Sequence, residues 1–158
     1  EDWKGKPVQY FVPPGYKKDV ARTCGRTREM LDFFSMKFGI DYPWEKYAQV
    51  IAEQFTGGGM ENTSATTLTD RSLHDERAFL DSDADGLIAH ELGHQWWGDL
   101  VTCKDWAHLW LNEGFASYCE IIWAEHHKGK EEAIYGMYGK AKSAIAGGKE
   151  RPIVDRRY

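Results

Sequence analysis

Apolar residues in the first third of the chain follow the spacings of two strands with a helix between them. Residues 8–12 (VQYFV) are apolar and aromatic and precede Pro13-Pro14-Gly15, which is typical of a short strand and its end. From residue 17 to residue 38 the apolar positions recur with approximate helical spacing, and Gly39 supplies a C-terminal stop. Residues 47–55 (YAQVIAEQF) then alternate as a strand does.

A glycine-rich segment, Gly57-Gly58-Gly59, comes next and leads into Met60-Glu61-Asn62. Consecutive glycines weaken a strand because they give up side-chain packing. Two interpretations stay open: a flexible turn, or a sheet edge where the backbone of a bound peptide comes close and pairs as an added strand. Residues 63–68 are polar and β-branched, which favours an edge strand leading away from that place.

An acidic segment over residues 81–86 (DSDADG) introduces a helical pattern over residues 85–97 that ends at Gly98. The segment resembles the start of an EF-hand calcium loop, but the twelfth position of that loop, which requires glutamate, would be Leu92. We therefore reject calcium. We expect instead that Asp83 or Asp85 caps the helix, where the helix dipole favours negative charge.

The rest of the chain is mainly helical in its pattern. The period of apolar residues predicts a helix over residues 109–127 and another over 130–146, which is closed by Gly147-Gly148. We expect residues 99–106 to form the connection before the first of these helices, and residues 151–158 to form an extended charged tail. Strands early in the chain and helices later indicate an α+β fold, with a small mixed β-sheet and a mainly helical second half.

The sequence His90-Glu91-Leu92-Gly93-His94 places two histidines on one helix face, so that their imidazole nitrogens can converge on one point. This pattern predicts a zinc site. Glu91 need not bind the metal, because from the same turn it can reach a water in an open zinc position. Glu113 follows after a gap of 18 residues within an apolar run of helical period, where an unpaired carboxylate would be costly. We expect Glu113 to be the third ligand, which together with a water gives the pattern of a catalytic zinc.

A second carboxylate on the same predicted helix has two interpretations. Glu120 lies seven residues beyond Glu113, about 20° off the same helix face. From there it could hydrogen-bond a zinc-bound imidazole. The alternative is an ordinary surface glutamate.

Composition places the chain among single-domain globular proteins, with one domain over residues 1–158. A hydrophobic content of 42% and an aromatic content of 14% argue against disorder, and the formal net charge of −5 argues against a nucleic-acid groove. No apolar run approaches the roughly 20 residues of a membrane span. The absence of an initial Met suggests a piece of a longer chain. The cysteines are odd in number and widely separated, which predicts buried thiols, although one pair could be bridged in an oxidising compartment: Cys24, Cys103 and Cys119.

Several motifs occur together in this chain, namely HELGHQWWGDLVT, WLNEGFASY, FGIDYPW and Gly58-Gly59-Met60-Glu61-Asn62. In this order they resemble the gluzincin aminopeptidases, the family that includes aminopeptidase N and leukotriene hydrolase. The resemblance extends over most of the chain. It implies a thermolysin-like catalytic domain, with an edge strand of the sheet beside the HExxH helix. It also implies that the N-terminal β-domain and the C-terminal helical domain of the family belong to a longer parent chain.

By this resemblance, the chain binds one Zn²⁺ and hydrolyses the N-terminal peptide bond of peptides with a free N-terminus. Glu91 would act as the base and Glu61 would hold the substrate's α-amino group. The backbone of residues 58–62, with Gly58 and Gly59 foremost, would run beside the substrate. The family also uses a tyrosine hydroxyl, further towards the C-terminus than this chain reaches, to stabilise the oxyanion. Tyr158 does not stand in that motif context, so we expect a weakly active core.

Two alternatives stay open. The first is a zinc endopeptidase of the thermolysin type, in which Glu61 is an incidental surface acid. The second is a non-catalytic zinc-containing interaction domain that keeps an inherited site. The intact ligands and base argue against the second, and the missing tyrosine argues for it. In the enzyme readings, the site lies in the cleft between the strand bearing residues 58–62 and the helix bearing His90.

Overall fold

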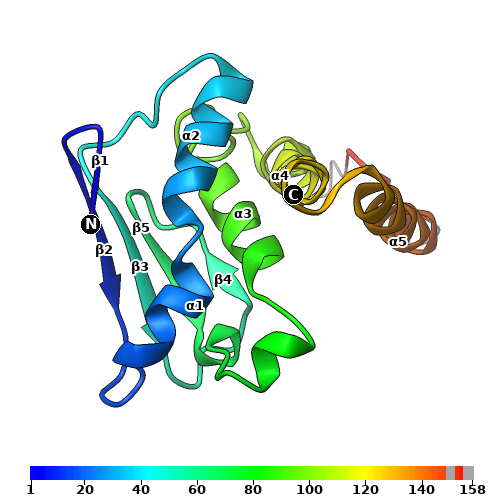
Figure 1. The fold of residues 1–158 in the computed structure, drawn as a ribbon. Helices are drawn as coiled ribbons and strands as arrows, with labels where there is room; N and C mark the ends of the chain where they lie inside the picture. The colour runs from blue at the N-terminus through cyan, green and yellow to red at the C-terminus, as the bar shows by residue number, and fades with distance from the viewer. Residues whose placement is uncertain (149–151, 155–158) are drawn as a thin grey trace.

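The computed structural model describes residues 1–148 and 152–154, and within them it contains a five-stranded sheet in the order β1-β2-β3-β5-β4 (Figure 1). The three inner strands, β2, β3 and β5, run parallel to one another, whereas β1 pairs antiparallel with β2 and β4 pairs antiparallel with β5 at the two edges. The sheet is therefore mixed. Its strands are β1 (Asp2–Trp3), β2 (Lys6–Phe11), β3 (Tyr47–Ala52), β4 (Gly59–Met60) and β5 (Ala65–Thr69).

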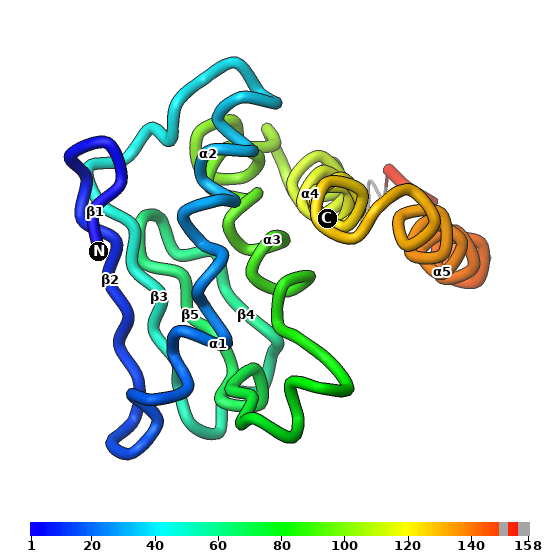
Figure 2. The backbone as a smooth tube through the Cα atoms, in the orientation of Figure 1, coloured from blue at the N-terminus to red at the C-terminus, as the bar shows by residue number. Residues whose placement is uncertain are grey.

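Helices cover one face of this sheet and then extend away from it. The helices are α1 (Val20–Cys24), α2 (Thr27–Phe38), α3 (Asp85–Gly93), α4 (Trp110–Lys128) and α5 (Lys130–Gly148). Figures 1 and 2 show α1, α2 and α3 in front of the sheet, α4 beside α3, and α5 outermost. The predicted α+β class, with a small mixed sheet and a mainly helical second half, is confirmed. Among the described helices, none combines the length and the apolar character needed to cross a membrane.

The hydrophobic core lies between the sheet and the helices α2 and α3. Fully buried apolar side chains from all three meet there: Val8, Ile51, Leu68, Met30, Leu31, Phe34, Ile88 and Leu92. Each such side chain contributes roughly 1.5–3 kcal/mol relative to leaving it exposed. This core fixes α3 on the sheet next to the edge strand β4, and α4 is then held through its own packing on α3.

The single long helix predicted over residues 17–38 is wrong. The chain forms a 3-10 turn at Lys17–Asp19, then α1, and then α2 after a break at residues 25 and 26. At the break, the hydroxyl of Thr27 donates a hydrogen bond of 2.7 Å to the carbonyl of Cys24. A threonine hydroxyl offers the backbone an alternative to the helical ladder, and the periodicity of apolar residues does not report it. The predicted stop at Gly39 agrees with its left-handed conformation, with φ of 70°.

Two details of the predicted zinc helix differ in the structure. The helix α3 ends at Gly93, not at Trp97, and the chain continues in tight turns to Gly98, whose φ of 138° is not helical. The N-cap is Ala84. Asp83 accepts a hydrogen bond from the backbone N–H of Asp85, but the Asp85 carboxylate is buried and forms an ion pair of 3.0 Å with Arg26. Asp85 therefore anchors α3 to α1 and α2 instead of capping its own helix.

The sheet also corrects two strand predictions. The segment predicted as an edge strand over residues 63–68 forms β5, which lies inside the sheet between β3 and β4, and β4 takes the edge. The strand β3 ends at Ala52 instead of residue 55, because the chain turns at Gln54, which has φ of 59°. Most of the tail predicted over residues 151–158, including Tyr158, lies outside the described residues. All three cysteines are free thiols.

Candidate active site

The helix α3 presents His90, Glu91 and His94 near its C-terminal end. The Nε2 atoms of His90 and His94 lie 3.2 Å apart, as the spacing of four residues on one helix face predicts. His94 occupies the C-cap position, and its backbone N–H still donates to the carbonyl of His90, so its side chain keeps the helical direction. The Nε2 atoms of the two imidazoles therefore point towards a single position in front of α3.

Glu113 reaches this point from the first turn of α4. Its Oε2 atom lies 3.3 Å from Nε2 of His90 and 3.6 Å from Nε2 of His94. The close packing of α4 on α3 makes this possible, because a Cβ atom at Gly93 would lie only 2.6 Å from Sγ of Cys119. The absent side chain of Gly93 thus lets the two helices approach until the three donor atoms meet.

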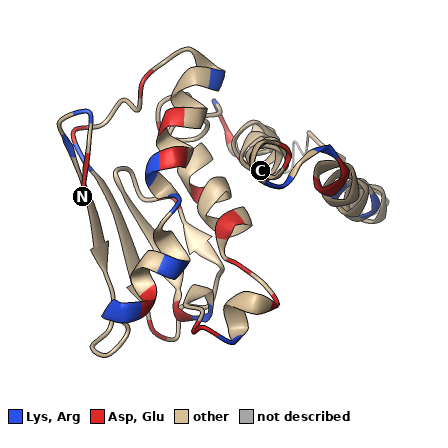
Figure 3. Ribbon diagram, viewed as in Figure 1, with Lys and Arg blue, Asp and Glu red and all other residues tan. Residues whose placement is uncertain are grey.

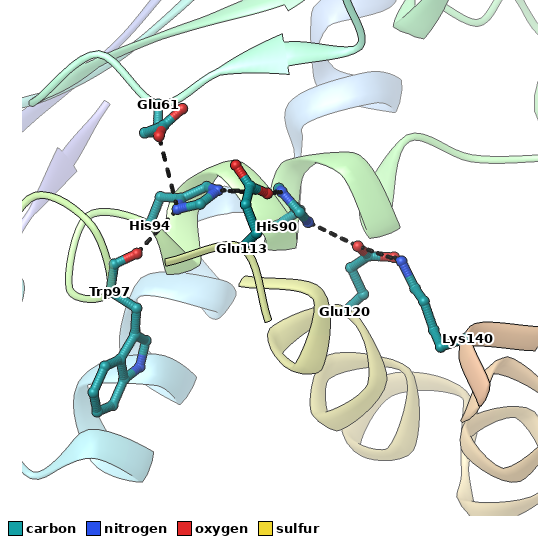
Figure 4. A network of polar contacts seen from close by, with 7 residues as sticks. All are labelled: Glu61, His90, His94, Trp97, Glu113, Glu120 and Lys140. Carbon is teal, nitrogen blue, oxygen red and sulfur yellow. Dashed lines mark hydrogen bonds and ion pairs between the residues drawn. The ribbon is translucent and has the colours of Figure 1, made fainter. Parts of the chain in front are cut away.

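Hydrogen bonds on the far side of each imidazole fix its tautomer (Figure 4). Nδ1 of His94 lies 3.0 Å from the carbonyl oxygen of Trp97, which can only accept a hydrogen bond, so Nδ1 carries a proton. Nδ1 of His90 lies 2.8 Å from Oε1 of Glu120, and Nζ of Lys140 lies 2.7 Å from the same oxygen. In neutral imidazoles, both Nε2 atoms then present lone pairs to the shared point.

This donor set fits a metal ion. Three lone-pair donors at 3.2, 3.3 and 3.6 Å from one another repel unless a cation or a proton lies among them. Two ligand atoms bound to zinc at about 2.0–2.1 Å in a tetrahedral site lie about 3.3 Å apart. The observed spacings match that edge length, so the residues present suit a small tetrahedral cation.

Ionisation in the metal-free chain follows from the same contacts. Burial lowers the pKa of His90, but the carboxylates of Glu113 and Glu120 outweigh it and raise the pKa to about 9. Burial likewise lowers the pKa of His94, and Glu113 reverses the effect. The imidazoles of His90 and His94 in turn hold the pKa of Glu113 far below its usual value. Protons on the histidines thus occupy the role that a metal cation would take.

Glu91 points from α3 towards the edge strand β4, and its side chain is almost fully buried. A Cβ atom at Gly59 would overlap the Glu91 carboxylate, so the glycine backbone of β4 lies directly against this acid. Burial raises the pKa of Glu91 to about 7, although His90 and His94 oppose the shift. A carboxyl group with a pKa near neutrality can both take up and release a proton at physiological pH.

A cavity of about 440 Å³ opens between β4, α3 and α4, and its lining collects most of the residues that the sequence singled out. The lining consists of Gly58, Gly59, Glu61, Leu87, His90, Glu91, His94, Glu113 and Glu120. The carboxylate of Glu61 points at His94, with 4.0 Å between Oε1 and Nδ1 (Figure 4). Met60 and Asn62 stand outside the lining: Met60 is exposed, and Asn62 accepts a hydrogen bond from the hydroxyl of Thr67 on β5.

Some participants escaped the sequence analysis. Lys140, on α5, contacts both carboxylate oxygens of Glu120. This contact depends on the packing of α5 on α4, which the sequence pattern does not reveal. The Trp97 carbonyl has no side-chain signature at all. In the view of Figure 3, positive and negative residues are interspersed over the helices.

Comparison with known proteins agrees with this constellation. Residues 22–153 match the peptidase family M1 domain. The chain belongs to peptidase family M1. This membership confirms the resemblance to the gluzincin aminopeptidases, whose members are metallopeptidases.

Among M1 relatives, the chain is 45% identical over 126 residues to aminopeptidase N of Streptomyces lividans, covering 76% of this chain and 14% of that protein. It is 34% identical over 126 residues to glutamyl aminopeptidase of Sus scrofa, covering 77% of this chain and 13% of that protein. With mitochondrial aminopeptidase 2 of Saccharomyces cerevisiae it shares 39% identity over 116 residues, covering 71% and 12%. The chain thus spans about an eighth of the length of the curated M1 relatives that it matches.

Proposed function

We propose that this chain is the catalytic core of a zinc aminopeptidase, part of a longer protein, with a thermolysin-like arrangement of sheet edge and metal helix. The observation that supports this most directly is the convergence of Nε2 of His90, Nε2 of His94 and Oε2 of Glu113 within 3.6 Å of one another. The membership of family M1 and the names of the relatives point to the same activity.

His90, His94 and Glu113 are the proposed ligands of one Zn²⁺. Two histidines and one glutamate form the ligand set of a catalytic zinc, which leaves a position for water or substrate. When bound, zinc polarises a substrate carbonyl and lowers the pKa of a bound water. Glu120 and the Trp97 carbonyl hold the two imidazoles in the tautomer that this ligation needs.

Glu91 is the proposed general base. Its carboxylate lines the cavity beside the ligands, and it takes a proton from the attacking water and returns it to the leaving amine. A pKa raised by burial to about 7 suits both transfers. Gly59 lies on the open edge strand β4, where a peptide substrate can pair as an added strand, and Gly58 precedes it with its carbonyl already accepting from the backbone N–H of Thr69.

Glu61 is the proposed anchor of the substrate's free α-amino group. It lines the cavity on the other side of the two histidines from Glu120 (Figure 4), and an ammonium held there limits the substrate to one residue before the scissile bond. This feature favours an aminopeptidase over a thermolysin-type endopeptidase. A peptide with a free N-terminus and its N-acetylated twin separate the two, because an aminopeptidase leaves the blocked peptide intact.

The test of the catalytic assignment compares Glu91→Gln with Glu125→Gln, an exposed glutamate on α4. We expect Glu91→Gln to keep one metal per chain by elemental analysis and to lose hydrolysis of aminoacyl reporters, while Glu125→Gln keeps both. A Glu91→Gln variant that still hydrolyses the reporters would contradict the proposal. If the chain is instead a non-catalytic interaction domain, its binding function should survive the substitution, because such a domain needs no base.

By the family resemblance, the oxyanion-stabilising tyrosine belongs to a downstream segment of the parent protein, so we expect low activity of the isolated chain. Loss of one oxyanion donor costs on the order of 10²–10³ in rate. Restoring the downstream segment of the parent protein should raise the activity by a comparable factor. If hydrolysis stays the same after restoration, the expected role of the downstream tyrosine is wrong.

A further inference from the structure

Gln95 is the most completely buried polar side chain next to the metal ligands, with an exposed fraction of 0%. It follows His94 directly in sequence, but its side chain points away from the proposed ligands. Oε1 of Gln95 accepts hydrogen bonds from the backbone N–H of Ser64, at 2.7 Å, and from the hydroxyl of Tyr42, at 3.2 Å. Nε2 donates a hydrogen bond of 3.0 Å to the carbonyl of Glu61.

The two backbone partners of Gln95 are the ends of the turn that joins β4 to β5. Ser64 has φ of 62°, in the left-handed region that residues with a side chain rarely adopt. Such a conformation persists only where the surroundings hold it. The Ser64 carbonyl accepts from the backbone N–H of Ala48 and from Nζ of Lys46, so the sheet fixes one side of the turn. Gln95 fixes the other side to the end of α3.

This connection has a consequence for Glu61. The carboxylate of Glu61 lies 4.0 Å from His94, and the carbonyl of the same residue is bound by the side chain next to His94. One buried amide therefore links the backbone that carries Glu61 to the backbone that carries a proposed ligand. The separation between Glu61 and His94 depends on this amide, since no helix or strand holds Glu61 itself.

We propose that Gln95 is a positioning residue that sets the distance between Glu61 and His94, and that it thereby determines the preference of the site for ligands with a free α-amine. The inference rests on the proposed function, in which Glu61 binds that amine. It assigns no contact between Gln95 and the substrate. If Gln95 had a merely structural role, replacing it would instead destabilise the fold and weaken the binding of both kinds of ligand equally.

The experiment measures amine preference by binding, so that it does not depend on the catalytic rate. The probes are L-alanine hydroxamate and propionohydroxamate, which share the metal-binding group and differ only in the α-amine. Their dissociation constants are measured by isothermal titration calorimetry on the zinc-loaded chain. The ratio of the two constants is the amine preference, and elemental analysis gives the zinc content of each variant.

The variants are Gln95→Met, Glu61→Gln as a reference, and Gln49→Met as a matched control. Gln49 is a buried glutamine on β3, with an exposed fraction of 1%, whose Oε1 accepts from Thr27 and which does not line the cavity. Should Gln95→Met fail to fold, Gln95→Asn replaces it, because an amide shorter by one methylene cannot reach Glu61 and Ser64 together.

For the wild-type chain we expect the amine to tighten binding by roughly 10- to 100-fold, as for a hydrogen-bonded charge. Gln95→Met and Glu61→Gln should each lose most of this preference, through weaker binding of alanine hydroxamate, with zinc content and propionohydroxamate binding unchanged. Gln49→Met should keep the preference.

Three results would overturn the inference, and they differ from one another. An unchanged amine preference in the folded Gln95 variant would refute it directly. A parallel loss of zinc and of both probes would mean that Gln95 is structural only. No preference in the wild type, or an undiminished one in Glu61→Gln, would show instead that the proposed role of Glu61 in amine recognition fails, and the inference with it.

Discussion

The contact between Gly93 on α3 and Cys119 on α4 gives a sharp test of how the site is assembled. A Cβ atom at Gly93 would lie 2.6 Å from Sγ and 2.9 Å from Cβ of Cys119, whereas non-bonded atoms are at their optimum at about 3.5–4.0 Å. Gly93→Ala must therefore push the two helices apart by roughly 0.5–1 Å or displace Cys119. Because Glu113 lies on α4, the same movement withdraws it from His90 and His94.

The expected change in the free energy of unfolding of Gly93→Ala is the sum of two opposing contributions. Inserting a methyl group into a packed interior costs about 1–3 kcal/mol. Replacing glycine by alanine inside a helix gains about 0.5–1 kcal/mol. The net destabilisation is about 1 kcal/mol, which lowers the Tm of a domain of this size by about 2–4 °C. Gly86→Ala is the control on the same helix, because a Cβ atom there meets nothing within 4 Å and only the gain remains.

The assay is thermal unfolding by circular dichroism, together with zinc affinity by competition with a chromophoric chelator. We expect Gly93→Ala to lower both quantities, and Gly86→Ala to raise the Tm slightly without changing the affinity. Adding Cys119→Gly to Gly93→Ala removes both clashing atoms, so a double-mutant cycle should show recovery of zinc affinity. If Gly93→Ala is as stable as Gly86→Ala and binds zinc equally well, the helices are not packed as closely as the structure shows.

Four further predictions concern the site and the cysteine thiols. Glu120→Gln should lower zinc affinity by roughly 10- to 100-fold in the chelator assay, and Lys140→Met should lower it by less. Lys142→Met, which removes an exposed lysine that lies over Tyr138, should leave the affinity unchanged. An equal effect of both lysine substitutions would refute the idea that Lys140 supports His90 through Glu120. Zinc binding should tighten as pH rises to about 9, because up to that pKa a proton on His90 competes with the metal, and titrations in buffers of different ionisation enthalpy should show proton release. The same pKa has the opposite consequence for the metal-free fold: protonated His90 stabilises it below pH 6.5, and this stabilisation is lost as pH rises to about 9. Unfolding curves that do not change over this window would contradict the assignment. Burial raises the pKa of the Cys24 and Cys119 thiols to about 12, so iodoacetamide at pH 8 should modify half-buried Cys103 first and the other two only after unfolding, as peptide mass spectrometry can establish.

From the sequence alone, we could predict those features that depend on residues within one or two helical turns of each other. The convergence of His90 and His94 follows from the helical period alone, and the stop at Gly39 follows from the freedom of glycine to adopt positive φ. The ordered motifs indicate the family without any tertiary information, and the match to the peptidase family M1 domain confirms it. The roles of Glu61, Glu91 and the three ligands remain proposals that the structure supports by geometry.

Only the tertiary structure decided which distant elements meet. The order of strands puts β5 inside the sheet and β4 at the edge, and the polar Thr66 is buried there with its hydroxyl hydrogen-bonded to the hydroxyl of Tyr47. The break between α1 and α2, the ion pair of Asp85 with Arg26 and the contact of Lys140 with Glu120 likewise join residues whose local patterns do not mention each other. The sequence by itself thus determined the helix that carries the proposed metal ligands, and the family. Packing decided the shape of the cavity, the hydrogen bonds to each imidazole and the position of Glu61. Contacts between segments that are remote in sequence depend on the whole fold, and they produce no periodic pattern of residues along the chain.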